Sequence, residues 1–262
     1  IVETGNRESI FHNAQHPYTK KLLAAIPSDS KQARAEAAEP LIQVRDLCTW
    51  FGQGKGKEPV KAVNKVSFDI NRGEVLGLVG ESGSGKSTIG RSILRLVPVT
   101  SGEVRFDGTD LTALEGRELK TMRRRMQMIF QDPFASLNPR MTVYDTLAEP
   151  LLLHGIESRA TVAQGVLKLM DDVGLARAFV RKYPHEFSGG QRQRIAIGRA
   201  LATRPEFIVA DEPVSALDVT IQAQILDLMQ ELGREYGLTM LFVSHDLAVV
   251  RHLADRILVL YK

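Results

Sequence analysis

The chain has 262 residues, of which 44% are hydrophobic and 25% charged, so its composition predicts a soluble globular protein with one large or two small domains. The formal net charge of +3 is too small to predict nucleic acid or an anionic membrane surface as the main partner. The single cysteine, Cys48, excludes an internal disulfide and any metal site built from cysteines, and we expect it to be a small core residue. No apolar run reaches the roughly 20 residues of a membrane helix, and no signal-peptide pattern is present, so we expect neither a membrane-spanning helix nor a signal peptide.

Residues 28–40 are polar, rich in alanine and end in Pro40, which is typical of a linker. They separate a short leading segment, residues 1–27, from a main domain, residues 41–262. Within the main domain, the region from about 133 to 201 has helical patterns and no convincing strand. We predict a helical subdomain there, inserted into an α/β core.

Short apolar runs alternate with helical stretches along the main domain. Residues 207–210 and 239–243 are apolar almost throughout, as expected for strands that are buried on both faces of a mostly parallel sheet. A helix is predicted over residues 86–96, and strands are predicted over residues 41–47, 60–70, 74–79, 126–130, 207–210, 239–243 and 256–260.

A glycine-rich turn lies between a predicted strand and a predicted helix. Its residues are Gly80, Glu81, Ser82, Gly83, Ser84, Gly85, Lys86, Ser87 and Thr88, which match G-x-x-x-x-G-K-[ST] in the context that this pattern requires. Glycines let the backbone N–H groups point inward, and the helix N-terminus adds partial positive charge. Lys86 would reach the β and γ phosphates of a nucleotide, and the Ser87 hydroxyl would bind Mg²⁺. The alternative is a Gly/Ser turn that binds nothing.

Two acids follow the buried run at residues 207–210. Asp211 and Glu212 stand at the carboxyl end of this predicted strand, where open α/β sheets place their ligands. Asp211 would hold Mg²⁺ directly or through water, and Glu212 would polarise or deprotonate an attacking water. Taken alone, such a pair is more often a helix cap or an exposed turn.

A second candidate anion site precedes the helical run QRQRIAIGRALATR. Ser188, Gly189, Gly190 and Gln191 supply a serine cap, two glycines that permit close approach, and a helix N-terminus with positive character. An ordinary helix start would look the same. The order of the phosphate loop, Gln131, this turn, the acidic pair, Asp218 and His245 along the chain decides between these interpretations.

These motifs together resemble those of the nucleotide-binding subunits of ABC transporters, over residues 41–262. The resemblance implies a P-loop NTPase core with an N-terminal antiparallel β subdomain and an inserted helical subdomain, and it implies ATP and Mg²⁺ as cofactors. Gln131 matches the glutamine that senses Mg²⁺ and water, and His245 matches the histidine that contacts the γ-phosphate. The turn at Ser188–Gln191, with Phe187 where leucine is commoner, would complete the ATP site of an opposing subunit, and Asp218 would close the D-loop.

Phe51 falls where the family stacks an aromatic ring on adenine, although the neighbouring Trp50 is also a candidate. Lys86, Gln131, Glu212 and His245 are the residues that the resemblance places in catalysis. Ser87, Gln131 and Asp211 are those that it places around Mg²⁺.

A narrower resemblance is to importers of peptides, nickel and related solutes, carried by FQDPFASLNPRMTV, KYPHEFSGGQRQRIAIGRALATRPEFIVADEPVSALDV and VSHDLAVV. In this subfamily the motifs IVE-x-G and HPYT-x-x-LL-x-A-x-P come after the core domain. Here the same motifs stand before it, at residues 1–5 and 16–27. Residues 1–27 therefore resemble the C-terminal tail of a preceding ATPase unit, as expected for a piece of a tandem protein. We nevertheless expect this tail to dock on its own core, with Ile1 near Lys262 and Val2 extending the sheet edge.

The resulting prediction is an ATPase that powers import of oligopeptides, dipeptides or similar solutes. It would work as a head-to-tail pair of nucleotide domains on transmembrane permease subunits, peripheral to the cytoplasmic side of the inner membrane. A solute-binding protein would be an indirect partner, and nucleic acid is not expected. The alternatives are a soluble ABC ATPase of DNA repair or translation, and a binding-only domain, which the intact Lys86, Asp211, Glu212 and His245 oppose.

Overall fold

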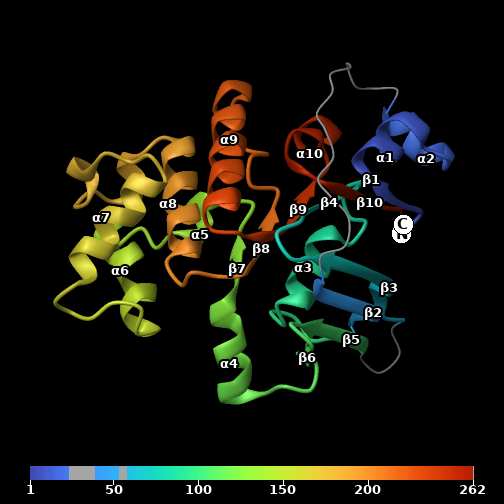
Figure 1. Cartoon of the computed structure of the whole chain (residues 1–262), viewed down its shortest axis with the longest axis horizontal. Helices are drawn as coiled ribbons and strands as arrows, with labels where there is room; N and C mark the ends of the chain where they lie inside the picture. The colour runs from blue at the N-terminus through green and yellow to red at the C-terminus, as the bar shows by residue number, and fades with distance from the viewer. Residues whose placement is uncertain (24–38, 53–57, 262) are drawn as a thin grey trace. The chain divides into compact units, whose positions relative to one another are not determined.

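The structure is a computed structural model that describes residues 1–23, 39–52 and 58–261. The chain divides into two compact units, one formed by Ile1–Lys120 with Thr239–Lys262 and the other by Thr121–Leu238 (Figure 1). Among the described residues, no helix has both the length and the apolar character needed to cross a membrane.

The first unit combines a mixed sheet, an antiparallel sheet and four short helices within its described residues. Its elements are β1 (Glu3–Asn6), α1 (Arg7–Asn13), α2 (Pro17–Leu23), β2 (Pro40–Phe51), β3 (Val60–Asn71), β4 (Val75–Gly80), α3 (Lys86–Ile93), β5 (Ser101–Phe106), β6 (Thr109–Asp110), β9 (Thr239–Ser244), α10 (Leu247–Leu253) and β10 (Arg256–Leu260).

The mixed sheet of the first unit has β4 at its centre, parallel to β10 on one side and to β9 on the other. Helices α3 and α10 lie on opposite sides of these strands (Figure 1), which is why the strands are apolar on both faces. Gly77 permits the contact with α10, because a Cβ there would come within 2.3 Å of Val250 Cγ1. The expected mostly parallel sheet of an α/β fold is confirmed.

The second sheet of the first unit is antiparallel, with strand order β3-β2-β5-β6. Its inner face is apolar, and Cys48 is buried at 3% exposure, as expected for a core residue. Buried Thr49 and Ser92 share a hydrogen bond of 2.8 Å between their hydroxyls, which ties β2 to α3. The antiparallel β subdomain is therefore confirmed, whereas its strands β5 and β6 were not predicted from the sequence.

The predicted helix over residues 86–96 was too long. Helix α3 ends at Ile93, and Arg95 adopts a left-handed backbone conformation with φ of 54°. This conformation cannot continue a right-handed helix, so the chain turns there. The side chain of Arg95 donates to the carbonyl oxygens of Leu111 and Thr112 at 2.8 and 2.6 Å, which holds the turn.

The leading segment adds a strand to the mixed sheet. β1 pairs with β10 in the antiparallel sense, and the Val2 amide donates to the Val259 carbonyl at 3.0 Å. The expectation that the tail docks on its own core and that Val2 extends the sheet edge is confirmed. The expectation that Ile1 lies near Lys262 stays a prediction, because Lys262 lies outside the described residues. Ile26, residues 28–38 of the predicted linker, and the side chains of Leu22 and Leu23 also lie outside them.

The second unit is mainly helical and also contains two strands. Its elements are β7 (Met126–Ile129), α5 (Pro133–Ser136), α6 (Val143–Leu153), α7 (Val162–Asp172), η1 (Arg177–Phe179), η2 (Pro184–Glu186), α8 (Gly189–Leu201), β8 (Phe207–Asp211) and α9 (Val219–Glu235), while α4 (Gly116–Arg125) runs from the first unit into this one. Residues 133–201 are all described and contain helices only. α8 packs against α5, α6, α7, α9 and β7.

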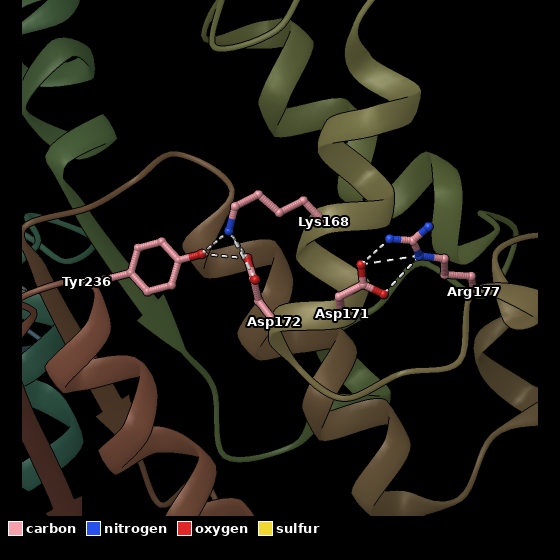
Figure 2. A network of polar contacts seen from close by, with 5 residues as sticks. All are labelled: Lys168, Asp171, Asp172, Arg177 and Tyr236. Atoms are coloured by element: carbon pink, nitrogen blue, oxygen red, sulfur yellow. Dashed lines mark hydrogen bonds and ion pairs between the residues drawn. The ribbon is translucent and has the colours of Figure 1, made fainter.

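A polar cluster joins α7 to the end of α9 in the second unit (Figure 2). The Asp172 carboxylate accepts hydrogen bonds from the Lys168 ammonium at 2.8 Å and from the Tyr236 hydroxyl, and Lys168 also donates to Tyr236 at 3.0 Å. Burial, together with the hydrogen bond to Asp172, raises the pKa of Tyr236. Arg177 forms a separate, exposed ion pair with Asp171.

Candidate functional site

The phosphate loop follows β4, and two of its glycines lie where neighbouring strands approach the backbone of the loop most closely. At Gly80 a Cβ would lie 2.3 Å from the Leu260 carbonyl oxygen, and at Gly85 it would lie 2.1 Å from that of Ala62. Gly85 also has φ of 94°, which a residue with a Cβ rarely adopts. The loop is thus held between β10 and β3 by contacts that only glycine allows.

Lys86 is the first residue of α3 and is 5% exposed. Its ammonium donates to the carbonyl oxygens of Gly80 and Glu81 at 2.9 and 2.8 Å, so the side chain curls back over the loop. The helix has no side-chain cap and no acid in its first turn. Both features leave positive charge at the loop, as an anion site needs.

His245 lies at the same edge of the mixed sheet as the phosphate loop. Val79 of β4 pairs with Ser244 of β9 in the parallel register, so Gly80 and His245 come next on neighbouring strands. Asp246 accepts the Ala248 amide at 2.8 Å and begins α10 directly afterwards. This cap fixes the turn on which the exposed His245 side chain stands.

The two candidates for adenine stacking differ in exposure. Phe51 ends β2 and is 41% exposed. Trp50 is only partly exposed, and the Lys61 ammonium lies 5.1 Å from the centroid of its ring. An open aromatic face is what base stacking requires, so the geometry favours Phe51.

In the second unit, Gln131 and Glu212 meet because of strand register. β7 and β8 are parallel with Ile129 opposite Ala210, and each side chain stands two residues further along its strand. The Gln131 amide donates to the Glu212 carboxylate at 3.0 Å. Asp211, the last residue of β8, is fully buried beside them.

Glu212 has φ of 46°, which is uncommon for a residue other than glycine. The turn is held by Ser215, whose amide and hydroxyl both donate to the Glu212 carbonyl, at 3.2 and 3.0 Å. Strained backbone of this kind gathers at functional sites, where the surroundings hold a side chain in one direction.

The serine-glycine turn begins α8 with a capping box. The Ser188 hydroxyl accepts the Gln191 amide at 3.4 Å, and the Gln191 side chain accepts the Ser188 amide at 3.1 Å. A Cβ on Gly190 would lie 2.5 Å from Ile221 Cγ2 of α9, so the glycine lets α8 approach the helix that Asp218 begins. The predicted serine cap is confirmed, whereas the role of the glycines in anion binding stays a prediction.

Phe187, which stands where the family more often has leucine, is buried at 4% exposure. Its ring packs edge-on against that of Phe179, with centroids 5.7 Å apart. The larger side chain therefore packs in the core of the helical region, and the cap at Ser188 forms next to it.

The donors suited to Mg²⁺ are the Ser87 hydroxyl in the first unit, and the Gln131 amide oxygen and the Asp211 carboxylate in the second. Mg²⁺ is usually held by one or two carboxylates together with phosphates and water. Within the described residues there is no cluster of three or more His, Cys, Asp or Glu side chains. A hydroxyl, an amide oxygen and a carboxylate are oxygen donors of the kind that Mg²⁺ accepts, so the groups that each unit presents fit this ion.

The tail residue Tyr18 has a contact that no sequence pattern indicated. Its ring packs on that of Tyr261, with centroids 4.8 Å apart, and Tyr261 directly follows the last residue of β10. The HPYT motif at residues 16–19 indicated the subfamily and no structural role for its tyrosine. Its place at the end of β10 follows from the β1–β10 pairing, of which the sequence predicted only that Val2 extends the sheet edge.

Comparison with known proteins identifies the family. The model of the ABC transporter family matches residues 63–215, and that of the oligopeptide/dipeptide transporter C-terminal region matches residues 2–52. A Brucella ovis protein, named as a peptide import ATP-binding protein, is 55% identical over 85% of this chain and 69% of its own length. The chain belongs to the ABC transporter family. Both resemblances seen in the sequence are thereby confirmed.

Further relatives bear on the extent and the fold of this family member. The glutathione import ATP-binding protein GsiA of Escherichia coli is 47% identical over 99% of this chain, which spans 47% of that relative. Among solved structures, the ATP-binding cassette MJ0796, in a dimeric post-hydrolysis state bound to ADP and Pi, has a TM-score of 0.75 and 33% identity. The match covers 84% of this chain and 94% of that one, and it confirms the fold of an ABC ATPase.

Proposed function

We propose that this chain binds and hydrolyses ATP to power the import of oligopeptides, dipeptides or similar small solutes through a membrane transporter. The observation that carries the proposal is the phosphate loop at the carboxyl end of β4, with buried Lys86 curled over it, in a chain of the ABC transporter family. The relatives named for peptide and glutathione import support the solute class.

We propose that the loop residues from Gly80 to Thr88 bind the phosphates through their amides and that Lys86 neutralises the β and γ phosphates. Ser87, Gln131 and Asp211 would hold Mg²⁺, which would neutralise negative charge on the nucleotide phosphates. Phe51 would stack on adenine, and His245 would contact the γ-phosphate from the same sheet edge as the loop.

Glu212 is the proposed general base. A carboxylate fixed in one direction can accept a proton from a water that lies in line with the γ-phosphate. Its hydrogen bond from Gln131 supports this assignment, because the amide orients the carboxylate and couples it to a proposed Mg²⁺ ligand.

We propose that two such domains act head to tail, each contributing Ser188–Gln191 to the ATP site of the other, with Asp218 at the junction. The dimeric state of the MJ0796 cassette supports this arrangement. The proposed location is the cytoplasmic face of the inner membrane, on permease subunits that receive solute from a binding protein. A role in DNA repair or translation is not favoured, since the relatives described above are named for import.

Replacement of Lys86 by alanine tests the proposal. We expect loss of ATP binding or hydrolysis by Lys86→Ala, while Lys120→Ala, which changes an exposed lysine of α4, behaves as the wild type. The measurements are ATP affinity by calorimetry and phosphate release. Near-normal values for Lys86→Ala would overturn the assignment of the loop. Stimulation of turnover by DNA or ribosomes, and not by permease subunits in vesicles, would overturn the role in import.

A further inference from the structure

A short turn between α1 and α2 brings the tail to Tyr261, the residue that follows β10. The Glu3 carboxylate of β1 accepts the Gln15 and His16 amides at 2.7 and 3.2 Å. The ring nitrogen Nδ1 of His16 accepts the Tyr18 amide at 3.2 Å. These bonds tie the start of α2 to the edge strand, so the direction of the Tyr18 side chain depends on the docking of β1.

The Tyr18 ring lies against the end of β10, beside the start of the phosphate loop. Its centroid is 4.8 Å from that of Tyr261, at an interplanar angle of 50°. The preceding residue, Leu260, pairs with Gly80, and the Leu260 carbonyl occupies the space of a Gly80 Cβ. The aromatic pair is thus one residue from the backbone that begins the loop.

The Tyr18 hydroxyl is buried, and among the described residues no hydrogen bond of normal geometry reaches it. Burial and the Glu81 carboxylate raise the pKa of Tyr18, while the Glu81 backbone lowers it. The hydroxyl is therefore neutral at physiological pH. A buried hydroxyl is costly to leave without a partner, and the backbone of Glu81 is the loop group that acts on this hydroxyl.

We infer that Tyr18 is a positioning residue of the nucleotide site, which holds the Glu81 backbone of the phosphate loop when nucleotide is bound. Lys86 holds the Gly80 and Glu81 carbonyls from within the loop. A phosphate that draws the Lys86 ammonium away removes this restraint, and Tyr18 then provides one from the tail side. The inference rests on the proposed function, and it adds that nucleotide affinity depends on the docked tail.

The test compares ATP and ADP affinities, by calorimetry with Mg²⁺, of the wild-type chain and Tyr18→Phe. This substitution keeps the ring on Tyr261 and removes only the hydroxyl. We expect both affinities to fall about threefold to tenfold, as the loss of one hydrogen bond allows, with an unfolding midpoint without nucleotide that stays the same or rises, because an unpaired buried hydroxyl is removed. Amide hydrogen exchange at Glu81 in the ATP-bound state should become faster. Tyr144→Phe, which alters a half-buried tyrosine on α6, should change neither.

The outcomes separate the inference from the proposed function. If the wild type binds ATP, Lys86→Ala does not, and Tyr18→Phe matches the wild type within twofold, the inference is overturned while the function stands. If Tyr18→Phe lowers the unfolding midpoint and leaves affinity unchanged, Tyr18 is only structural and the inference again fails. If the wild type does not bind ATP, the proposed function itself fails.

Discussion

The side-chain amide of Gln131 donates a hydrogen bond of 3.0 Å to the carboxylate of Glu212. The two residues are 81 positions apart and meet because β7 and β8 share a parallel register, with Ile129 opposite Ala210. A proposed Mg²⁺ ligand thus orients the proposed general base.

Replacement of Glu212 by glutamine tests the role of this pair. The amide keeps the size of the side chain but cannot take a proton, so we expect Glu212→Gln to bind ATP normally and to lose about 10² to 10⁴-fold in turnover. An ATP-dependent dimer should accumulate, measurable by light scattering. Glu231→Gln, an exposed change on α9, serves as the control. Wild-type turnover by Glu212→Gln with its partner domain present would assign the base elsewhere.

The shape of the phosphate loop predicts a sharp difference between two glycine substitutions. Gly85 and Gly108 both have positive φ, of 94° and 75°, so alanine strains the backbone at either position. Only at Gly85 does a Cβ meet backbone, 2.1 Å from the Ala62 carbonyl, whereas at Gly108 nothing lies within 4 Å. Gly108→Ala should cost about 1 kcal/mol and leave ATP affinity unchanged, while Gly85→Ala should abolish binding. Equal effects on calorimetric affinity would contradict this account of the loop.

The polar cluster of Figure 2 predicts how much the contact between α7 and the end of α9 contributes to stability. Tyr236→Phe removes a hydrogen bond to Asp172, whose side chain is only 12% exposed, so we expect the free energy of unfolding to fall by about 1 to 2 kcal/mol. Arg177→Gln breaks the exposed pair with Asp171 and should change stability little. Urea unfolding of both variants checks this. A larger loss for Arg177→Gln than for Tyr236→Phe would contradict it.

The attachment of the tail should depend on pH through Glu3. Burial by itself would raise the pKa of Glu3, but the hydrogen bonds from the Gln15 and His16 amides help to hold it below the ordinary value of 4.5. A carboxylate with a lowered pKa in the folded state stabilises fully above its unfolded pKa and loses that contribution as pH falls through the folded value. The protection of the Gln15 and His16 amides from hydrogen exchange, taken relative to the intrinsic rate at each pH, should therefore be high at neutral pH and fall below about pH 4.

Substitution isolates this carboxylate from the others that titrate in acid. Glu3→Gln should show rapid exchange at Gln15 and His16 already at neutral pH, while Glu58→Gln, which alters an exposed side chain, keeps the wild-type profile. Slow exchange in Glu3→Gln at pH 7 would show that the tail is held by the β1 strand alone.

Strands β8, β9 and β10 were predictable because each is a continuous apolar run, which is stable only when both faces of the strand are covered. The phosphate loop was predictable for a similar reason, since its glycines, lysine and serine serve local backbone geometry and charge. The end of α3 was not predictable, because the left-handed residue that ends it leaves only a weak local pattern. Strands β5 and β6 were not predictable either, because they are short and half exposed.

The sequence by itself determined the α/β class, the family and the identity of the chemical groups, because periodicity, glycine positions and the order of motifs are local properties of the chain. Only the tertiary structure decided which of these groups meet. Strand register brings Gln131 to Glu212 and places His245 beside the phosphate loop. The pairing of β1 with β10 brings Tyr18 to the end of β10. Such contacts arise from hydrogen bonding between strands far apart in the chain, and no single segment encodes them.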